Sequence, residues 1–419
     1  MDWSKLPDLG AAALLLCAFA SVARRSHTPV SRLWLTGWLM IVMHFAAFLF
    51  IPLSGIWGDL ATFITLAGLV WAGILFMWAS VPYRHEHSSS WMFAIVLSTN
   101  TLYISLTMLG RSGLRALAPA AILLGALPLA YSLISLRRLN HSLRWTTVIL
   151  YSTLSIFLLH IQHKPGYGSY IAINALIFVV YFDCCIHFWY TYRRATAGAF
   201  ITIAGFFTWA SVFIVRPWIE TLASGPHLES EVWNLPKYIV SVGMILLLLE
   251  DQIEHNKHLA LHDELTGLPN RRLFQDRLAS ALERARRTGT RAALLVVDLD
   301  HFKQVNDTHG HHVGDLLLQN ASSIFAGRLR RSDTVARTGG DEFCIILEDP
   351  TSREYATIIG QSLLQKLKEP MKLGNQEVSV GASVGVAIYP EDACDAESLC
   401  IAADLRMYED KHETLDPCV

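Results

Sequence analysis

The stretch Arg337-Thr338-Gly339-Gly340-Asp341-Glu342-Phe343 combines features suited to binding an anion and a cation side by side. Glycines let the backbone approach a bulky anionic ligand, because no side chain intervenes. The two carboxylates that follow offer hard oxygen ligands for a divalent cation. β-prone residues flank the paired glycines, which predicts a hairpin with a positive-φ turn at Gly339 and Gly340. An ordinary surface hairpin is the alternative.

A further carboxylate follows a second β-prone run. Ala292–Val297 is apolar throughout and predicts a buried strand that ends at Asp298. An aspartate at a strand end is usually a turn residue. Beside a hairpin that carries Asp341 and Glu342, however, it can help to build a Mg²⁺ site from oxygen ligands.

The residues around these carboxylates form longer motifs. Gly339–Phe343 resembles the GGDEF signature of diguanylate cyclases, with all five letters intact. Asp263–Arg272 resembles the opening motif of that family, D-x-L-T-G-L-x-N-R-R. Asp298–Asp307 resembles its D-x-D-x-F-K-x-x-N-D motif, and His309–Asp315 resembles H-x-x-G-D. The resemblance runs from Asp263 to Lys411 and implies an α/β fold whose mostly antiparallel sheet has five strands.

The resemblance also implies roles for individual residues. The metal, Mg²⁺ or Mn²⁺, would be held by Asp298, the Leu299 carbonyl, Asp341 and Glu342. The catalytic residues would be Asp341, Glu342 and Lys303, with Lys303 neutralising phosphate charge. The substrate GTP would contact Asn306, His311, Asp315, Gly339, Gly340 and Lys411. Asn306 and Asp315 would read guanine, because a carboxylate accepts from its N1–H and N2–H₂ groups, a donor pair that adenine lacks. This motif explains the three nearby histidines better than a zinc site does.

A second ligand site is implied by Arg330-Arg331-Ser332-Asp333, at the family's spacing for an R-x-x-D inhibitory site. Arg330 and Asp333 would bind the product there. The alternative is an ordinary charged turn.

The end of the chain departs from the family. Val378–Ala387 resembles its core strand, and Ala403–Lys411 resembles the helix whose lysine binds a terminal phosphate. The family usually continues G-R-N, whereas this chain continues His412-Glu413-Thr414. One phosphate contact is therefore expected to be missing.

The first half of the chain has the composition of a membrane protein. The 419 residues are 52% hydrophobic and only 17% charged, with a net charge of −2 that gives no hint of nucleic-acid binding. The seven cysteines include no C-x-x-C pair, so they predict neither a disulfide framework nor a zinc site. Nine apolar runs are long enough to be candidate spans, the last being the shortest. They are Leu6–Ala23, Leu33–Leu53, Leu60–Val81, Trp91–Leu109, Ala116–Leu136, Trp145–Ile161, Tyr170–Tyr190, Phe200–Val215 and Leu235–Leu249.

The loop charges predict an orientation. The odd-numbered loops carry nine Lys and Arg residues and the even-numbered loops carry five. The positive-inside rule therefore places the N-terminus outside and, with nine spans, the second half in the cytoplasm. A cleaved signal peptide is disfavoured, because Asp2 and Asp8 offset Lys5 and leave no basic segment at the N-terminus.

Few readily ionisable residues lie well inside these runs: His44, His160, Asp183 and His187. Asp183 and His187 share a helix face at i,i+4 spacing. Haem, metal or proton sensing is one interpretation. The simpler one is that these residues hydrogen-bond neighbouring helices.

The last run passes into a polar segment with 3,4 spacing of apolar or small residues. We interpret residues 250–262 as a helical stalk between a membrane part at 1–249, expected to be a sensor, and a cyclase domain at 263–419. A homodimer is expected to form through the membrane part and the stalk. A plain linker helix is the alternative.

The function that the resemblance implies is condensation of two GTP to cyclic di-GMP, with release of two pyrophosphates, at a bacterial inner membrane. Two alternatives remain. One is a catalytically weak domain that binds GTP or cyclic di-GMP as an effector. The other is a transporter with an appended cyclase, against which the lack of detectable inverted repeats argues.

Overall fold

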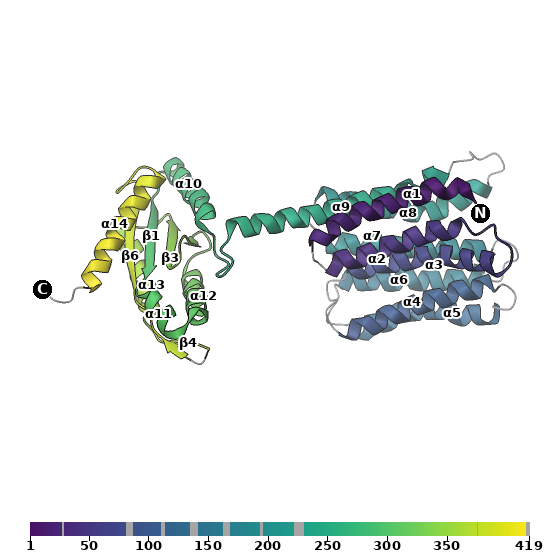
Figure 1. Ribbon diagram of the computed structural model, residues 1–419, viewed down its shortest axis with the longest axis horizontal. Coiled ribbons are helices and arrows are strands. Elements are labelled where there is room, and N and C mark those ends of the chain that lie inside the picture. Colours follow the sequence, from purple (N-terminus) through teal and green to yellow (C-terminus); the bar gives the residue numbers. More distant parts are fainter. Residues whose placement is uncertain are drawn as a thin grey trace. The chain divides into compact units, whose positions relative to one another are not determined.

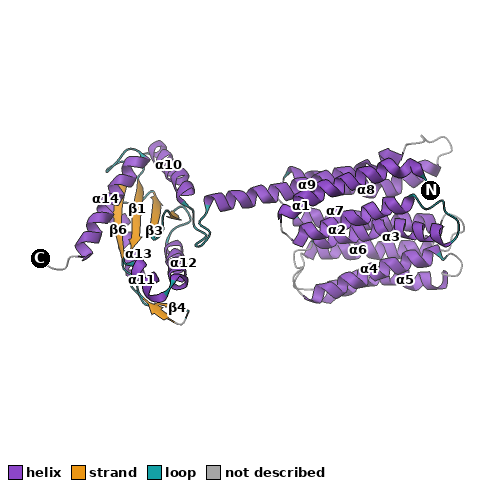
Figure 2. Ribbon diagram, in the orientation of Figure 1, coloured by secondary structure: helices purple, strands orange, loops and turns teal. Residues whose placement is uncertain are grey.

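The computed structural model describes residues 1–26, 29–80, 87–109, 114–134, 141–161, 168–192, 196–221, 230–374 and 376–415. The chain divides into two compact units, Met1–Ile253 and Glu254–Val419. Unit 1 is helical and unit 2 combines helices with strands (Figure 1, Figure 2).

Unit 1 is a bundle of helices, preceded by a short 3-10 helix, η1 (Trp3–Lys5). Its described helices are α1 (Leu6–Ser26), α2 (Pro29–Phe48), α3 (Ile56–Ala79), α4 (His87–Met108), α5 (Leu114–Ile134), α6 (His141–Ile161), α7 (Gly168–Thr191), α8 (Ala197–Thr221) and α9 (Ser230–Leu261). Eight of them are long and apolar enough to cross a membrane. In α5 the apolar part is shorter, Ala116–Ala130.

The last of these helices extends beyond its apolar run at both ends. Leu235–Leu249 was predicted as the shortest span, followed by a helical stalk, and α9 has 32 residues and runs from Ser230 to Leu261. Pro236 does not end the helix, and the polar residues after Leu249 continue it. This continuation agrees with the helical stalk that was expected at 250–262.

Unit 1 is apolar both in its interior and on its outer surface. Phe206 and Trp209 are fully buried, whereas Ile156 and Phe200 are at least 70% exposed. A soluble protein would not expose such residues so widely, and lipid would cover them.

The predicted orientation in the membrane depends on charged loop residues. Several of these cations, such as Arg137 and Lys164, lie outside the described residues.

Unit 2 is an α/β domain. Its elements are α10 (Arg271–Thr288), β1 (Ala292–Leu299), α11 (Phe302–His309), α12 (His311–Arg328), β2 (Thr334–Arg337), β3 (Glu342–Glu348), α13 (Arg353–Leu367), β4 (Met371–Leu373), β5 (Gln376–Val378), β6 (Ala382–Tyr389) and α14 (Ala396–Leu415). Asn270 caps the start of α10 by accepting from the Arg272 and Leu273 amides, and Gly289 ends it in the left-handed region.

The main sheet has the order β2-β3-β1-β6, with every neighbouring pair antiparallel. The expected antiparallel character is confirmed, but among the described residues this sheet has four strands rather than five. The stretch expected to form one core strand, Val378–Ala387, is divided between two sheets. Val378 pairs with Met371 in the separate β4-β5 hairpin, and β6 begins only at Ala382. Between them, the Gly381 carbonyl accepts from the Asp300 amide at 2.9 Å.

Helices cover both faces of this sheet (Figure 2). On one face, Leu295 and Ile345 pack in a cluster with Leu317 of α12 and Leu363 of α13. On the other, side chains such as Leu294 pack with α10 and α14. Strand β1 is buried along its whole length because it lies inside the sheet and between two helical layers.

Candidate active site

Two carboxylates face each other at the end of β1. Asp298 is directly opposite Glu342 of β3 and, on its other side, Ser383 of β6. Side chains directly opposite in an antiparallel pair share one face, with Cβ atoms about 4.5–5.5 Å apart. Like charges at such a pair repel, so the site favours a cation between or beside them.

Asp341 is held at the same end of β1. Its carbonyl accepts from the Leu299 amide at 3.2 Å. Burial and then the charge of Asp298 raise the pKa of the Asp341 carboxyl above its ordinary value of 3.8. Its ionised form is therefore destabilised, and a bound cation would favour that form.

The hairpin between β2 and β3 closes with a four-residue loop. The Thr338 amide donates to the Glu342 carbonyl at 3.0 Å. Arg337 donates to the Gly340 carbonyl from Nε at 3.1 Å and from Nη2 at 2.8 Å. The prediction of positive φ at the two glycines is wrong, because neither is among the positive-φ residues of the described chain. The arginine, rather than glycine conformation, stabilises this turn.

The two glycines are instead important because they lack a side chain, which leaves space for other groups. A β-carbon at Gly339 would lie 2.6 Å from Oε2 of Glu342, whereas one at Gly340 would meet no atom within 4 Å. Gly339 thus gives the Glu342 side chain its room. Gly340 faces open space, and both glycines line an open hollow of about 590 Å³ together with Arg271 and Arg272.

Lys411 reaches the carboxylates from α14. Its ammonium donates to Asp298 Oδ1 at 2.6 Å, and this hydrogen bond raises the pKa of Lys411. The ring of the next residue, His412, lies 4.3 Å from that of Tyr408. His412, which stands where the family usually has the glycine of G-R-N, therefore packs against Tyr408 in the preceding turn of α14.

The predicted guanine-reading residues are on two consecutive helices. Asn306 is on α11, and Asp315 is on α12 next to Gly314. A β-carbon at Gly314 would lie 1.9 Å from Oδ1 of Asn306, so the amide packs directly on the backbone of α12. The structure therefore places the Asn306 side chain against the backbone at Gly314, the residue before Asp315. Lys303 and His311 are exposed.

The Arg330–Asp333 turn is held by its own aspartate. Asp333 accepts from the Arg330 amide at 2.9 Å and from the Glu348 amide at 3.3 Å. The Arg330 guanidinium is exposed and lies 5.3 Å from the centre of the Tyr355 ring. Tyr355 was not singled out from the sequence, since it is on another helix, α13.

The four ionisable residues predicted to lie well inside the apolar runs have local partners or are exposed. His44 Nδ1 is 2.7 Å from the Thr65 carbonyl, and His187 Nδ1 is 3.2 Å from Asp183 Oδ1. His160 is exposed near the end of α6. These contacts agree with the simpler interpretation, hydrogen bonding within and between helices.

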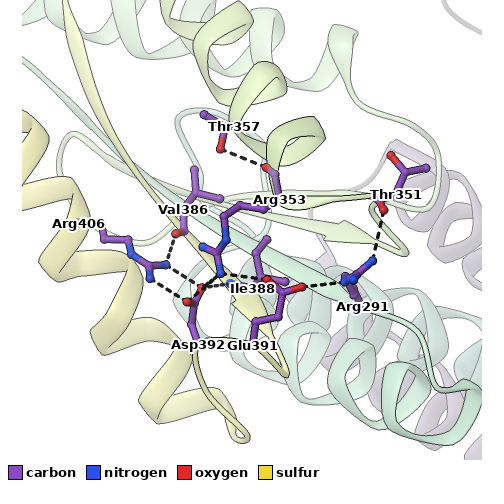
Figure 3. A network of polar contacts seen from close by, with 9 residues as sticks. All are labelled: Arg291, Thr351, Arg353, Thr357, Val386, Ile388, Glu391, Asp392 and Arg406. Carbon is purple, nitrogen blue, oxygen red and sulfur yellow. Dashed lines mark hydrogen bonds and ion pairs between the residues drawn. The ribbon is translucent and has the colours of Figure 1, made fainter.

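Sequence reasoning missed two groups in unit 2. Asp300 accepts from the Ser383 hydroxyl at 2.9 Å, which ties the loop after β1 to β6. Asp392 forms a network with two arginines (Figure 3). Arg406 donates to its two oxygens at 2.7 Å each, and Arg353 Nη2 lies 2.9 Å from both. The carboxylate and arginines are far apart in sequence, so no local motif could reveal the network.

Asp392→Ala should lower the free energy of unfolding of a 254–419 fragment by about 2–4 kcal/mol, because it removes the charge-assisted hydrogen bonds that Arg406 and Arg353 donate to this nearly buried carboxylate. Thermal unfolding followed by circular dichroism at pH 7 measures this. The hydrogen bonds from Arg406 lower the pKa of Asp392. The stabilisation is therefore complete above the unfolded pKa of about 3.9 and is lost as the pH falls below it.

Glu391→Gln is the matched control, because Glu391 joins the same network but its side chain is 38% exposed. Its effect should stay within about 1 kcal/mol. Equal losses for Asp392→Ala and Glu391→Gln would contradict a central role for Asp392.

The donor set suits a hard cation. Asp298, Asp341, Glu342 and the Leu299 carbonyl all offer oxygen, the ligand that Mg²⁺ prefers. As they stand, no three His, Cys, Asp or Glu side chains of the described residues are grouped to hold an ion. Lys411 instead neutralises Asp298, so an ion there would replace the lysine ammonium as the partner of this carboxylate.

Comparison with known proteins agrees with this geometry. Residues 260–416 match the family described as "Diguanylate cyclase, GGDEF domain". This part of the chain is a GGDEF domain. The diguanylate cyclase TpbB of Pseudomonas aeruginosa is 39% identical to the chain over 166 residues, which are 39% of this chain and 38% of TpbB. The bifunctional diguanylate cyclase/cyclic di-GMP phosphodiesterase MucR of the same species is 37% identical over 190 residues, 42% of this chain and 28% of MucR.

A solved structure of the TpbB GGDEF domain alone is 40% identical, with a TM-score of 0.36, and the match covers 36% of this chain and 89% of that one. The chain thus spans well under half the length of these two curated relatives, which include both a cyclase and a bifunctional enzyme. The GGDEF domain follows a part with eight helices apolar enough for a membrane.

Proposed function

We propose that the chain is a membrane-anchored diguanylate cyclase, which condenses two GTP to cyclic di-GMP and releases two pyrophosphates. The observation that carries the proposal is the pair Asp298–Glu342, directly opposite at the strand end beside an intact GGDEF hairpin. Its 39% identity to a diguanylate cyclase supports the same activity.

Each residue of the site would have its own role in the reaction. A Mg²⁺ or Mn²⁺ ion held by Asp298, the Leu299 carbonyl, Asp341 and Glu342 would polarise the α-phosphate and help to deprotonate the attacking 3′-hydroxyl. Lys303 and Lys411 would neutralise phosphate charge. Gly340 leaves room for the ligand, because nothing lies within 4 Å of its missing β-carbon. Asn306 and Asp315 would bind guanine, with His311 lining the site.

Two such domains are needed for one product. Each would bind one GTP, and the two sites would face each other, so the active species would be a homodimer. Residues 250–262 are the proposed stalk of that dimer, between a sensor at 1–249 and the cyclase domain at 263–419. The continuous helix α9 supports this division, since it includes the whole proposed stalk except His262.

A second candidate is an effector that binds GTP or cyclic di-GMP without turnover. The observation that favours it is the departure after Lys411, where His412 packs against Tyr408 and the family's phosphate-binding arginine is missing. The intact carboxylates favour catalysis.

The test uses full-length protein in lipid nanodiscs. With Mg²⁺ and GTP we expect cyclic di-GMP and pyrophosphate in a ratio of one to two. No dinucleotide should form with ATP, or with GTP and excess chelator. Binding of GTP without product, with either Mg²⁺ or Mn²⁺, would establish the effector function instead.

The proposed location is the bacterial inner membrane with the GGDEF domain in the cytoplasm, where GTP is. A reporter fused after Val419 should therefore be cytoplasmic, and one at Met1 periplasmic. Enzymatic reporters active on only one side of the membrane measure both. Finding both termini on the same side would rule out nine spans.

A further inference from the structure

A cavity of about 470 Å³ lies in unit 1 at the end of the bundle where α9 begins. Residues from η1 to α3 line it together with residues from α7, α8 and α9. The volume is about three times the 150 Å³ that accommodates benzene in an engineered protein cavity. It therefore accepts a molecule larger than a single aromatic ring, and it falls in the range of small-molecule sites.

Much of the wall of this cavity is aromatic. Phe45 and Phe48 contribute from α2, Trp209 and Phe213 from α8, and Trp233 from α9. Such a wall suits an apolar body and offers flat surfaces against which a ring can stack.

The charge in the cavity centres on Lys237 of α9. Its residue is 7% exposed, and its ammonium donates to Asn234 Oδ1 at 2.7 Å and lies 4.4 Å from the centre of the Phe45 ring. Neither partner is an anion, and a buried cation is costly without one. Asp8, 4% exposed, lines the same cavity, and Lys5 adds a second ammonium.

Carboxylates lie beside the other two cations of the wall. Lys5 interacts with the charge of Asp2, and the Arg216 Nε is 2.8 Å from Glu220. Lys237 differs, because its ammonium contacts a neutral amide and an aromatic ring, and Asp8 acts on it through its charge. An anionic group of a ligand would therefore lie against Lys237.

Two further polar groups of the wall lack a partner. Within the described chain, the buried polar atoms without a hydrogen bond include Thr65 Oγ1 and Trp209 Nε1. Both residues line the cavity and are at most 4% exposed. An indole N–H can only donate, and a hydroxyl can donate or accept. Both atoms are covered, so they would donate to a ligand only after a small shift of the wall, and Lys237 is the donor on which the site mainly depends.

We propose that this cavity binds a small carboxylate with an apolar body, and that the carboxylate lies against Lys237. The proposal concerns binding and does not depend on the cyclase activity. Because Lys237 is on α9, the ligand would contact the helix that runs on to Leu261 in unit 2. Tight packing couples α9 to its neighbour, since a β-carbon at Gly243 would lie 2.5 Å from Thr202 Oγ1 of α8.

The test is isothermal titration of the full-length protein in phosphatidylcholine nanodiscs. The probes are 4-phenylbutanoate and octanoate, each compared with its uncharged amide. At least one carboxylate should bind, with an affinity at least ten-fold above that of its amide. Lys237→Met should weaken this binding ten-fold or more, because it keeps the length of the side chain and removes its charge.

Trp209→Phe, which removes one hydrogen-bond donor and keeps a ring, should weaken binding about three-fold to ten-fold. Lys257→Met is the matched control. It makes the same change on the same helix at an exposed residue that does not line the cavity, and it should bind as the unmodified protein does.

Three results would overturn the proposal: no binding of either carboxylate, equal binding of an amide, or unchanged binding by Lys237→Met. If Lys237→Met does not fold, unchanged binding by both Trp209→Phe and Thr65→Val overturns it. Loss of carboxylate binding in nanodiscs that contain phosphatidylglycerol would assign the cavity to a lipid phosphate, and would also overturn it.

Discussion

Glu342→Gln should lower the rate of cyclic di-GMP synthesis by at least about 100-fold, because the amide keeps the shape of the side chain and loses the charge that holds the metal. Glu342 is opposite Asp298, so this change also removes a like-charge contact. The fold should therefore be unharmed, and its free energy of unfolding unchanged or raised by up to about 1 kcal/mol. Product is measured at saturating GTP and Mg²⁺.

Glu348→Gln is the matched control at the other end of β3. Its ion pair with Arg284 is partly exposed, so its loss should leave the rate nearly unchanged. A folded Glu342→Gln protein that retains more than a few per cent of the activity would contradict the assignment of the metal ligands.

Arg330→Ala should weaken inhibition by cyclic di-GMP at least ten-fold and leave the initial rate nearly unchanged. The guanidinium can donate forked hydrogen bonds to a guanine edge and a phosphate, each worth about 1.5–3 kcal/mol, which alanine cannot replace. The turn itself should persist, because Asp333 accepts from the backbone amides of Arg330 and Glu348, not from the arginine side chain. The rate is measured against added cyclic di-GMP at fixed GTP.

Arg331→Ala is the control, since it removes a neighbouring exposed arginine from the same turn. Identical inhibition curves for Arg330→Ala and the unmodified protein would reduce the pair to an ordinary charged turn. Asp333→Ala is a poorer test, because it removes hydrogen bonds that hold the turn.

Elements that depend on neighbouring residues alone could be predicted from the sequence. The apolar run Ala292–Val297 and the residues around Gly339 predict a strand and a hairpin from neighbours alone, and both form.

One error is local: the turn at Gly339 and Gly340 is stabilised by Arg337, three residues away, and needs no positive φ. The other two concern contacts between distant segments. The expected core strand is interrupted at Gly381, where the backbone instead bonds to Asp300, about eighty residues earlier. The pairing of Lys411 with Asp298, across 113 positions, was likewise invisible, because the lysine was assigned to phosphate alone.

Helix α9 contains neither glycine nor proline between Met244 and Leu261. An α-helix turns by about 100° per residue, so inserting one residue in this segment reorients everything beyond it, whereas inserting seven restores its direction to within about 20°. Under the proposal that two catalytic sites must meet, residue exchanges on the exposed faces of this segment should be tolerated. A change of length would not, unless it came in steps of seven. Natural variants are therefore expected to differ in the residues of this segment but to keep its helical register.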